Sequence, residues 1–268
     1  MTQQADTTDA TPRATVAVSV ADAVAVVRLT ETERRNPLSL ETMRSVTDAL
    51  RGIGARPDVR AVVVEATGPV FSAGHDLTEM VDRTLDDERE IFQACTEMME
   101  TVQSIPQPVI AAVQGAAIAA GCQLVATSDL AIAADTAVFG TPGVKIGLFC
   151  STPMVAVSRV VGRKRALQML LTGATIDAAT AADWGLINEV VPPDHVVGRA
   201  HELARAIAQA SPLTLRVGKQ AFYRQIDLPQ SDAYAEMAEV MATNAMTCDA
   251  QEGMTAFLEK RPPEWQGR

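Results

Sequence analysis

The sequence predicts an α/β (α+β) fold with a helical region at its C-terminal end, and three observations predict it. Residues 60–67 and 108–114 are nearly continuous runs of valine, isoleucine and alanine, which is typical of strands buried on both faces of a sheet. Helical patterns lie between the strand patterns, as in chains that build parallel sheets. From Thr152 onward the pattern is helical almost to the end.

The elements of the first half follow from local signals. Residues 14–20 and 23–30 alternate and are rich in valine, so the Ala21-Asp22 turn between them predicts a β-hairpin. Ser39 is placed to cap a helix that runs to about Gly54. The strand over 60–67 ends at Gly68-Pro69, and residues 70–76 follow as a turn. An acidic stretch then leads into a helix that ends near Ser104.

The second half begins with the strand over 108–114 and a loop of very small residues over 115–121. A helix over 122–127, strands over 129–134 and 137–140, and a loop over 141–149 follow. The later helices are predicted over 194–210, 212–226, 230–247 and 249–260, after a short strand at 186–191. We therefore divide the chain into a disordered polar tail (1–13), a core (14–193) and a C-terminal helical region (194–268).

Charge and composition exclude several classes of function. The chain has 268 residues with 33 acidic and 23 basic side chains, so its formal net charge of -10 disfavours binding to nucleic acid or to an anionic membrane. It contains neither an apolar run long enough to span a membrane nor the pattern of a secretory signal. The four cysteines form no CxxC pair and no cluster with the histidines. We expect reduced thiols, no metal and a cytoplasmic location.

Two loops of small residues each follow a buried strand. The first is Ser72-Ala73-Gly74-His75-Asp76, and the second is Gly115-Ala-Ala-Ile-Ala-Ala-Gly121 at the start of a helix. Neither matches a dinucleotide fingerprint or a phosphate loop. Exposed backbone N–H groups at such places favour a developing negative charge, although tight helix–strand packing explains the second loop equally well. Together the loops predict two N–H donors that converge on one oxygen.

The order and spacing of several motifs resemble the enoyl-CoA hydratase/isomerase (crotonase) superfamily. The resemblance covers residues 14–262, and a run at 145–153 resembles its enoyl-CoA hydratase domain-containing protein 3 branch. The motifs are Phe71-Ser-Ala-Gly-His-Asp-Leu77, Pro108-Val-Ile-Ala-Ala-Val-Gln-Gly115, Ala120-Gly-Cys-Gln123, Ser128-Asp129-Leu-Ala-Ile-Ala133, Phe139-Gly-Thr-Pro-Gly143, Leu171-Thr-Gly173, Ala182-Asp-Trp-Gly-Leu186 and Gly253-Met-Thr-Ala-Phe-Leu-Glu-Lys260.

The resemblance implies a crotonase/ClpP-like spiral of ββα units whose C-terminal helices build homo-trimers or hexamers. It implies a coenzyme A thioester of fatty-acid metabolism as substrate or ligand, with no tightly bound cofactor. The oxyanion-hole N–H groups of the family fall on His75 and Ala120. The residues expected to contact coenzyme A are Ser72, Ala73, His75, Phe257 and Lys260, the last two reaching a neighbouring subunit's ligand.

This chain departs from the family at the two glutamates that activate water in the hydratases. These positions hold Gln123 and Gly143. Hydration needs a base and an acid, and proton transfer of this kind contributes ~10²–10⁴-fold to the rate. An amide cannot take a proton from water, and glycine has no side chain. We expect very weak hydration, which glutamates at both positions should restore if Gly143 does not lie at positive φ.

Other residues near these motifs have open roles. For His75, packing or ligand contact is favoured over chemistry, and Asp76 is expected to stabilise its turn. Cys150 lacks a partner base and is expected to be an inert thiol. Lys145, Ser151 and Thr152 are candidates for the acyl end of the site. Arg34 and Arg35 lie where the family meets the ligand's phosphates, or are simply solvated.

Two functions therefore compete. The first is an acyl-CoA enzyme, nominally an enoyl-CoA hydratase or isomerase, or one of altered thioester chemistry. The second is a non-catalytic acyl-CoA binding or regulatory protein on the same fold. A nucleotide-dependent oxidoreductase lacks its phosphate fingerprint, and a serine peptidase of the related spiral fold lacks a recognisable Ser–His pair. Turnover of crotonyl-CoA measured beside binding separates the first two.

Overall fold

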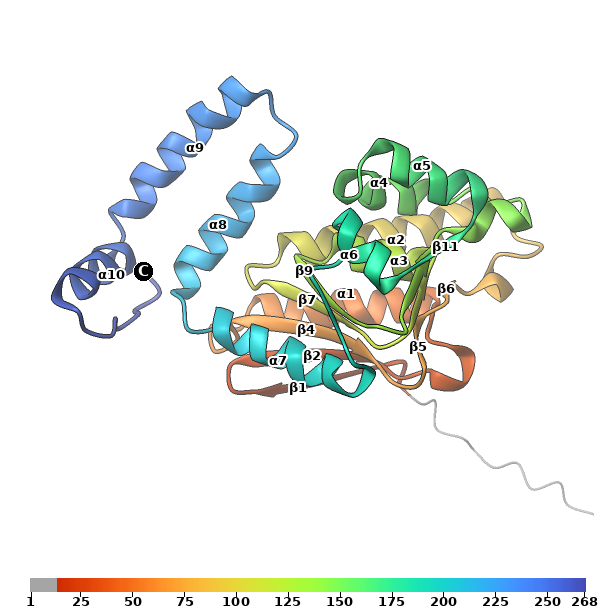
Figure 1. Ribbon diagram of the computed structural model, residues 1–268, viewed down its shortest axis with the longest axis horizontal. Coiled ribbons are helices and arrows are strands. Elements are labelled where there is room, and N and C mark those ends of the chain that lie inside the picture. Colours follow the sequence, from red (N-terminus) through yellow and green to blue (C-terminus); the bar gives the residue numbers. More distant parts are fainter. Residues whose placement is uncertain (1–13) are drawn as a thin grey trace, which may run out of the picture.

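A six-stranded sheet forms the centre of the fold in the computed structural model, which describes residues 14–268 (Figure 1). Its strand order is β1-β2-β4-β7-β9-β12, and only the β1–β2 hairpin is antiparallel. The strands are β1 (Val16–Ala21), β2 (Val24–Leu29), β4 (Ala61–Ala66), β7 (Val109–Val113), β9 (Leu130–Ala134) and β12 (Glu189–Val191). As predicted, β7 is buried along its whole length.

A second sheet runs beside the first, in the order β11-β10-β8-β5. Its strands are β5 (Val70–Ser72), β8 (Ala116–Ile118), β10 (Val138–Gly140) and β11 (Thr175–Asp177). The chain passes from β4 to β5, from β7 to β8 and from β9 to β10, so each unit supplies one strand to each sheet. Because β5 and β8 are parallel neighbours, with Ser72 opposite Ala117, the segments that follow them lie side by side.

The small-residue loops contain more structure than the sequence indicated. The stretch 115–121 includes strand β8, and helix α3 (Ala120–Thr127) begins at residue 120 rather than 122. Residues 74 and 75 form the short strand β6 (Gly74–His75), which pairs with β3 (Pro37–Leu38). Strands of two or three residues carry too little periodicity to be recognised in a sequence, so their pairing is a tertiary effect.

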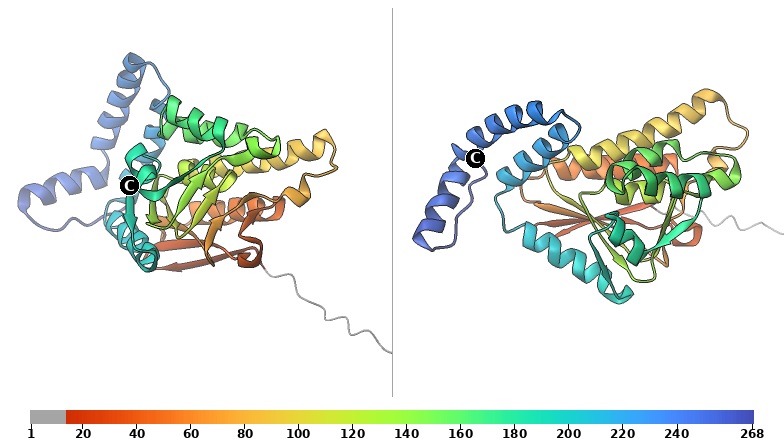
Figure 2. Two further views of the ribbon diagram at one scale, coloured as in Figure 1. Left: turned by 45° about the vertical axis from the view of Figure 1, so that its right-hand side comes forward. Right: turned by 45° about the horizontal axis from the view of Figure 1, so that its top comes forward.

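Helices cover both sides of the sheets. On one side α1 (Leu40–Gly54) packs against α2 (Leu85–Ser104), and Ser39 caps α1 as expected, because its Oγ accepts the Thr42 N–H. On the other side α7 (Val196–Ile207) lies against β4, β7 and β9 (Figure 2). The remaining core helices are α4 (Ser151–Val160), α5 (Arg163–Thr172) and α6 (Ala178–Trp184), and the 3₁₀ helices are η1 (Thr32–Arg34), η2 (Leu77–Glu79), η3 (Pro142–Ile146) and η4 (Pro193–His195).

Three further helices project from the core as an arm (Figure 1). They are α8 (Pro212–Gln225), α9 (Gln230–Ala245) and α10 (Cys248–Glu259), close to the predicted bounds. The division after residue 193 stays a prediction, since α7 packs on the core sheet and the projecting arm starts at α8. The proposed tail, 1–13, lies outside the described residues. In α9 no residue is buried, and Tyr234 and Met241 are 71% and 70% exposed.

A buried ion pair anchors the arm to the core. Lys219 on α8 donates to the Val102 and Gln107 carbonyls at 2.8 and 2.9 Å, and its Nζ lies 2.7 Å from the Asp129 carboxylate. The same carboxylate accepts the Tyr223 hydroxyl at 2.7 Å. Burial lowers the pKa of Lys219, although Asp129 opposes this shift. Asp129, a residue of one family-like motif, therefore holds α8 in place.

We expect Lys219→Ala to lower the free energy of unfolding by about 3 kcal/mol, because it leaves the partly buried Asp129 carboxylate without its partner charge. Urea unfolding at fixed protein concentration measures the change. The control Lys164→Ala, at an exposed position of α5, should stay within about 0.5 kcal/mol of the native chain. Equal effects of the two substitutions would contradict the role of this anchor.

Candidate functional site

The two small-residue loops meet at glycines that leave no room for a side chain. Gly74 has φ of +93°, and a Cβ there would lie 2.9 Å from the Ala119 Cβ and 3.3 Å from the Ala120 nitrogen. A Cβ on Gly121 would lie 2.7 Å from the Ser72 carbonyl oxygen. Such distances are too short for real contacts, so both positions require glycine. The backbone of the first loop therefore rests directly on the start of α3.

The backbone of the second loop is held in an unusual conformation. Ala119 has φ of 50° and ψ of -114°, and its N–H donates to the Gly140 carbonyl at 2.8 Å. This places Ala120 at the first position of α3, where the N–H has no partner within the helix. A non-glycine residue at positive φ costs free energy and is typical of functional sites. Gly74, the residue before His75, lies against the backbone of Ala120, where an added Cβ would be 3.3 Å from the Ala120 nitrogen.

The ring of His75 points into the protein. Its Nδ1 lies 3.4 Å from the Leu38 carbonyl oxygen, the ring meets Phe92 edge-on with centroids 5.5 Å apart, and its buried Nε2 has no hydrogen-bond partner. Burial lowers the pKa of His75 below its ordinary value, partly opposed by the Leu38 carbonyl. The ring is therefore neutral at pH 7 and packs against α2, which favours the expected packing role.

We expect His75→Phe to keep the affinity for acyl-CoA, because the backbone supplies the N–H and the ring does not. The swap should change stability by less than about 1.5 kcal/mol, as for other substitutions of similar volume. Its counterpart, Gly74→Ala, should lose affinity, since the methyl group would collide with Ala119. Titration calorimetry with butyryl-CoA makes the comparison. If a folded His75→Phe protein no longer bound butyryl-CoA, the His75 ring would have a direct role at the site.

Gln123 lies one turn into α3 and is 5% exposed. Its Oε1 accepts the Cys95 thiol of α2 at 3.8 Å, and its N–H bonds the Ala119 carbonyl at 3.0 Å. Burial raises the pKa of Cys95 to about 12, so that neighbour is a neutral thiol. The position expected to hold one water-activating glutamate thus carries an amide beside a thiol, and neither group is a base at neutral pH.

Gly143 is enclosed by the chain that follows it. A Cβ there would lie 2.0 Å from the Leu148 carbonyl oxygen and 2.8 Å from the Cys150 Sγ. The Leu148 N–H donates back to the Gly143 carbonyl at 3.0 Å. Gly143 is not among the glycines at positive φ. The expected obstacle to a side chain was conformational; the observed one is steric, because residues 148–150 fill its space.

Cys150 is buried beside Gly143 and is 8% exposed. Burial raises the pKa of its thiol, and the Gly143 backbone only partly opposes the shift. The group is therefore a neutral thiol, as the sequence predicted. Lys145 and Ser151 flank it at exposed positions, and Thr152 is half-buried. Lys145 packs along Gly173, where its side-chain carbons would lie 3.1 Å from an added Cβ.

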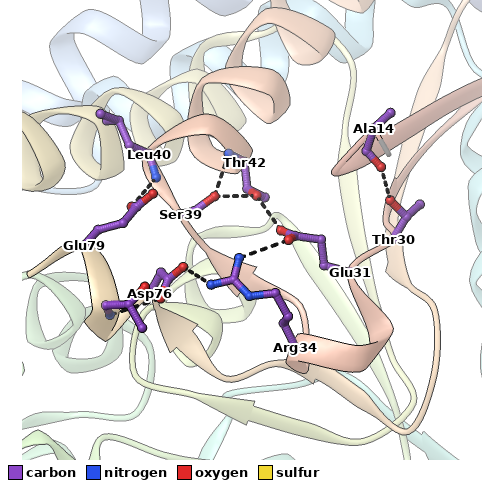
Figure 3. A network of polar contacts seen from close by, with 10 residues as sticks. Ala14, Thr30, Glu31, Arg34, Ser39, Leu40, Thr42, Asp76 and Glu79 are labelled. Atoms are coloured by element: carbon purple, nitrogen blue, oxygen red, sulfur yellow. Dashed lines mark hydrogen bonds and ion pairs between the residues drawn. The ribbon is translucent and has the colours of Figure 1, made fainter. Parts of the chain in front are cut away.

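Arg34 and Arg35 differ in their side-chain contacts. The Arg34 guanidinium pairs with the buried Asp76 carboxylate and bonds Glu31 at 3.3 Å, so it is engaged within the chain (Figure 3). Arg35, at φ of 63°, accepts the Ala73 N–H at its carbonyl and keeps an exposed side chain. Of the two, only Arg35 presents its side chain to solvent without an ion pair in residues 14–268.

Asp76 keeps its charge although it is buried. Burial would raise its pKa, but the Thr78 hydroxyl, the Arg34 guanidinium and the Thr78 N–H together hold the pKa below the ordinary value. The stabilisation from this carboxylate is present above the unfolded-state pKa and is lost as the pH falls through the lower folded-state pKa. At neutral pH the pair is fully formed. Sequence reasoning assigned Asp76 to its turn and missed its partner, which lies 42 residues away.

Ser72 and Ala73 hold the first loop. The Ser72 Oγ accepts the Gly74 N–H at 3.2 Å, while Ala73 is exposed. Phe257 and Lys260 instead lie at α10, far from this loop in every view, and Phe257 is 83% exposed (Figures 1 and 2). A cavity of about 420 Å³ lies at the joint of core and arm, lined by Gln107, Arg216 and Trp265 among others. It does not include the two loops.

Comparisons with known proteins define the class. The sequence model of the enoyl-CoA hydratase/isomerase family matches residues 19–268. Human enoyl-CoA hydratase domain-containing protein 3, mitochondrial, is 42% identical over 255 residues, which cover 95% of this chain and 84% of that protein. The chain therefore belongs to the enoyl-CoA hydratase/isomerase family, as its motifs predicted.

Solved structures confirm the crotonase fold. The crystal structure of human enoyl-CoA hydratase domain-containing protein 3 superposes with a TM-score of 0.92 at 41% identity, covering 94% of this chain and 100% of that one. An enoyl-CoA hydratase from Mycobacterium smegmatis gives 0.91 at 41% identity, with 94% and 98% covered. No helix in residues 14–268 is long and apolar enough to cross a membrane, and these residues hold no cluster of three metal-ligating side chains.

Proposed function

We propose that this chain binds acyl-CoA thioesters and holds the thioester oxygen between the backbone N–H groups of His75 and Ala120. The contact of Gly74 with Ala119 and Ala120 is the observation that supports the proposal, because it sets the backbone of the first loop directly against the start of α3. Backbone donors fixed in advance stabilise an enolate without reorganising. The family and the human relative, both named for enoyl-CoA hydratase, support the same ligand class. The role in fatty-acid metabolism is part of the proposal.

Ordinary enoyl-CoA hydration should be very weak. The positions at which the family carries glutamates hold a buried amide and a glycine whose side-chain space is filled by Leu148 and Cys150. The thiols of Cys95 and Cys150 have raised pKa values, and the His75 ring packs edge-on against Phe92 of α2. Both thiols are therefore protonated at neutral pH, and neither serves as a base for water. The proposed site polarises a thioester and lacks the pair that would hydrate it.

Two forms of this function remain distinct. In one, the chain is an acyl-CoA binding or regulatory protein without turnover. In the other, it catalyses a different thioester reaction, in which the backbone donors would stabilise an enolate without the pair of glutamates. Titration with crotonyl-CoA and coenzyme A tests binding, and hydration of crotonyl-CoA measured beside it tests turnover. Failure of the native chain to bind either compound would overturn the proposal.

We expect Gln123→Glu alone to raise hydration of crotonyl-CoA only slightly, because one carboxylate cannot serve as both base and acid. Gly143→Glu should lower the free energy of unfolding by about 1–3 kcal/mol, since its Cβ would overlap the Leu148 carbonyl. The double variant should therefore lose stability before it gains turnover. This revises the expectation from sequence alone, in which both glutamates restore hydration.

The matched control for the glycine change is Gly198→Glu on α7, where nothing lies within 4 Å of an added Cβ. Its stability should change less than that of Gly143→Glu, as measured by urea unfolding. Turnover is then compared at equal folded fraction. A stable double variant with strong hydration would show that residues 147–150 move aside, and the steric account would be wrong.

The proposed assembly is a homo-trimer or a pair of trimers. Exposed Tyr234 and Met241 on α9, together with Phe222 on α8 and Ile226 directly after it, leave apolar surface on the arm. Phe257 and Lys260 lie too far from the loops of their own chain, which suits the family pattern in which they contact a neighbour's ligand. A monomeric mass at micromolar concentration would contradict the assembly. The cytoplasmic location remains a prediction.

We expect Lys260→Ala to weaken binding of butyryl-CoA and to flatten its dependence on ionic strength, because one cation near the ligand phosphates is lost. The control Arg205→Ala removes the same charge from an exposed position of α7. It should leave the salt dependence unchanged. Titrations at several salt concentrations make the comparison. If the affinity of the native chain and that of Lys260→Ala depended on ionic strength in the same way, Lys260 would not be part of the binding site.

A further inference from the structure

Residues 31–42 are fastened to residues 72–79 along most of their length. The Arg35 carbonyl accepts the Ala73 N–H at 3.0 Å, and β3 pairs with β6 so that Leu38 lies opposite His75. At the far end, the Glu79 carboxylate accepts the Leu40 N–H at 2.8 Å, at the start of α1. The loop that carries one proposed oxyanion donor is therefore supported by a segment remote in the sequence.

One ion pair joins the two segments next to His75, whose N–H is one of the proposed donors. Arg34 pairs with Asp76, the residue directly after His75, and also bonds Glu31 (Figure 3). The other oxygen of Glu31 accepts the Thr42 hydroxyl at 3.1 Å. The second oxygen of Asp76 accepts the N–H and hydroxyl of Thr78 at 3.1 and 2.7 Å. Arg34 thus links carboxylates of both segments, and each carboxylate is oriented by a further bond.

Apolar packing just beyond His75 is limited to the partly buried Met80. Leu77, Val81 and Leu85 are 48%, 65% and 66% exposed, whereas Phe71 before the loop is fully buried. On its N-terminal side the peptide of His75 is held by Gly74, whose N–H bonds the Ser72 hydroxyl. On its C-terminal side the nearest side-chain anchor is Asp76. The direction of the His75 N–H therefore depends on polar contacts, of which Arg34–Asp76 is the charged one.

We propose that Arg34 is a positioning residue of the oxyanion hole, which pairs with Asp76 to fix the peptide that presents the His75 N–H to a thioester oxygen. This rests on the proposed function, because it assigns a support to the same site. Arg34 acts through Asp76 and does not contact the ligand. Its effect should therefore fall on recognition of the thioester oxygen and spare the rest of coenzyme A.

The first test compares two ligands that differ in that oxygen. Butyryl-CoA carries the thioester carbonyl, and S-butyl-CoA is the thioether without it. The native chain should prefer butyryl-CoA, and Arg34→Gln should reduce the ratio of the two affinities about fivefold, the effect of one hydrogen bond. Affinity for the thioether should change little. Arg34→Lys should restore part of the preference, and Asp76→Asn should lose it as Arg34→Gln does.

The matched control is Arg44→Gln. Arg44 on α1 is 57% exposed, against 50% for Arg34, and pairs with one carboxylate, Glu90 of α2. Arg44→Gln removes the ion pair of an arginine of similar exposure, although its partner Glu90 is 52% exposed and Asp76 is 7% exposed, and it does not touch residues 72–79. The affinity ratio should stay at its native value in this control. An unchanged ratio in Arg34→Gln, or an equal fall in Arg44→Gln, would overturn the role of Arg34.

A second test needs no ligand and separates this inference from the proposed function. Amide hydrogen exchange over residues 72–79 should be faster in Arg34→Gln and Asp76→Asn than in the native chain, and unchanged in Arg44→Gln. If the native chain binds neither ligand, the proposed function is wrong. Amide hydrogen exchange still tests whether Arg34 and Asp76 stabilise residues 72–79. Native exchange rates at 72–79 in Arg34→Gln would overturn the inference.

Discussion

The candidate site depends on one packing constraint, the contact of the β5–β6 loop with the start of α3. The chain alternates between two sheets, so β5 and β8 become parallel neighbours although more than forty residues separate them. Their following segments then approach until Gly74 and Gly121 leave no space for a methyl group. Close backbone approach is what allows two N–H groups to reach one oxygen, because neither is kept apart by side chains. The small residues of both loops are the consequence.

A site of backbone donors tolerates changes that a site of side chains does not. An N–H group keeps its place when its own side chain is exchanged, so the proposed oxyanion hole is independent of the residues at 123 and 143. Proton transfer has no such independence, since it needs a particular functional group at a particular position. In this structure the space for a side chain at Gly143 is filled by Leu148 and Cys150, whereas the proposed backbone donors need no such space. Residues 148–150 leave no room for a glutamate side chain at position 143. The absence of a carboxylate there therefore follows from the backbone as well as from the sequence.

Charge is used sparingly and locally in this acidic chain. Lys219–Asp129 joins the arm to the core, and Arg34–Asp76 joins two segments beside the candidate site. In both pairs the carboxylate is mostly shielded from water and also accepts uncharged donors, which is the arrangement in which a buried ion pair compensates for its desolvation. The two pairs connect segments that are far apart in the sequence. They define geometry at the places where hydrophobic packing leaves it open.

The sequence by itself determined the order of the major elements and the family. Strong hydrophobic patterns mark the buried strands, such as 61–66 and 109–113, and the four C-terminal helices. The departures from the family at Gln123 and Gly143 can be identified directly from the residues at these positions. Only the tertiary structure decided the rest. The short strands β5, β6 and β8, the direction of the His75 ring, the partner of Asp76 and the crowding around Gly143 all arise from contacts between distant segments. Local sequence patterns indicate which face of a helix or strand is apolar. They do not indicate which atoms of a distant segment will lie within 2 or 3 Å of a given residue.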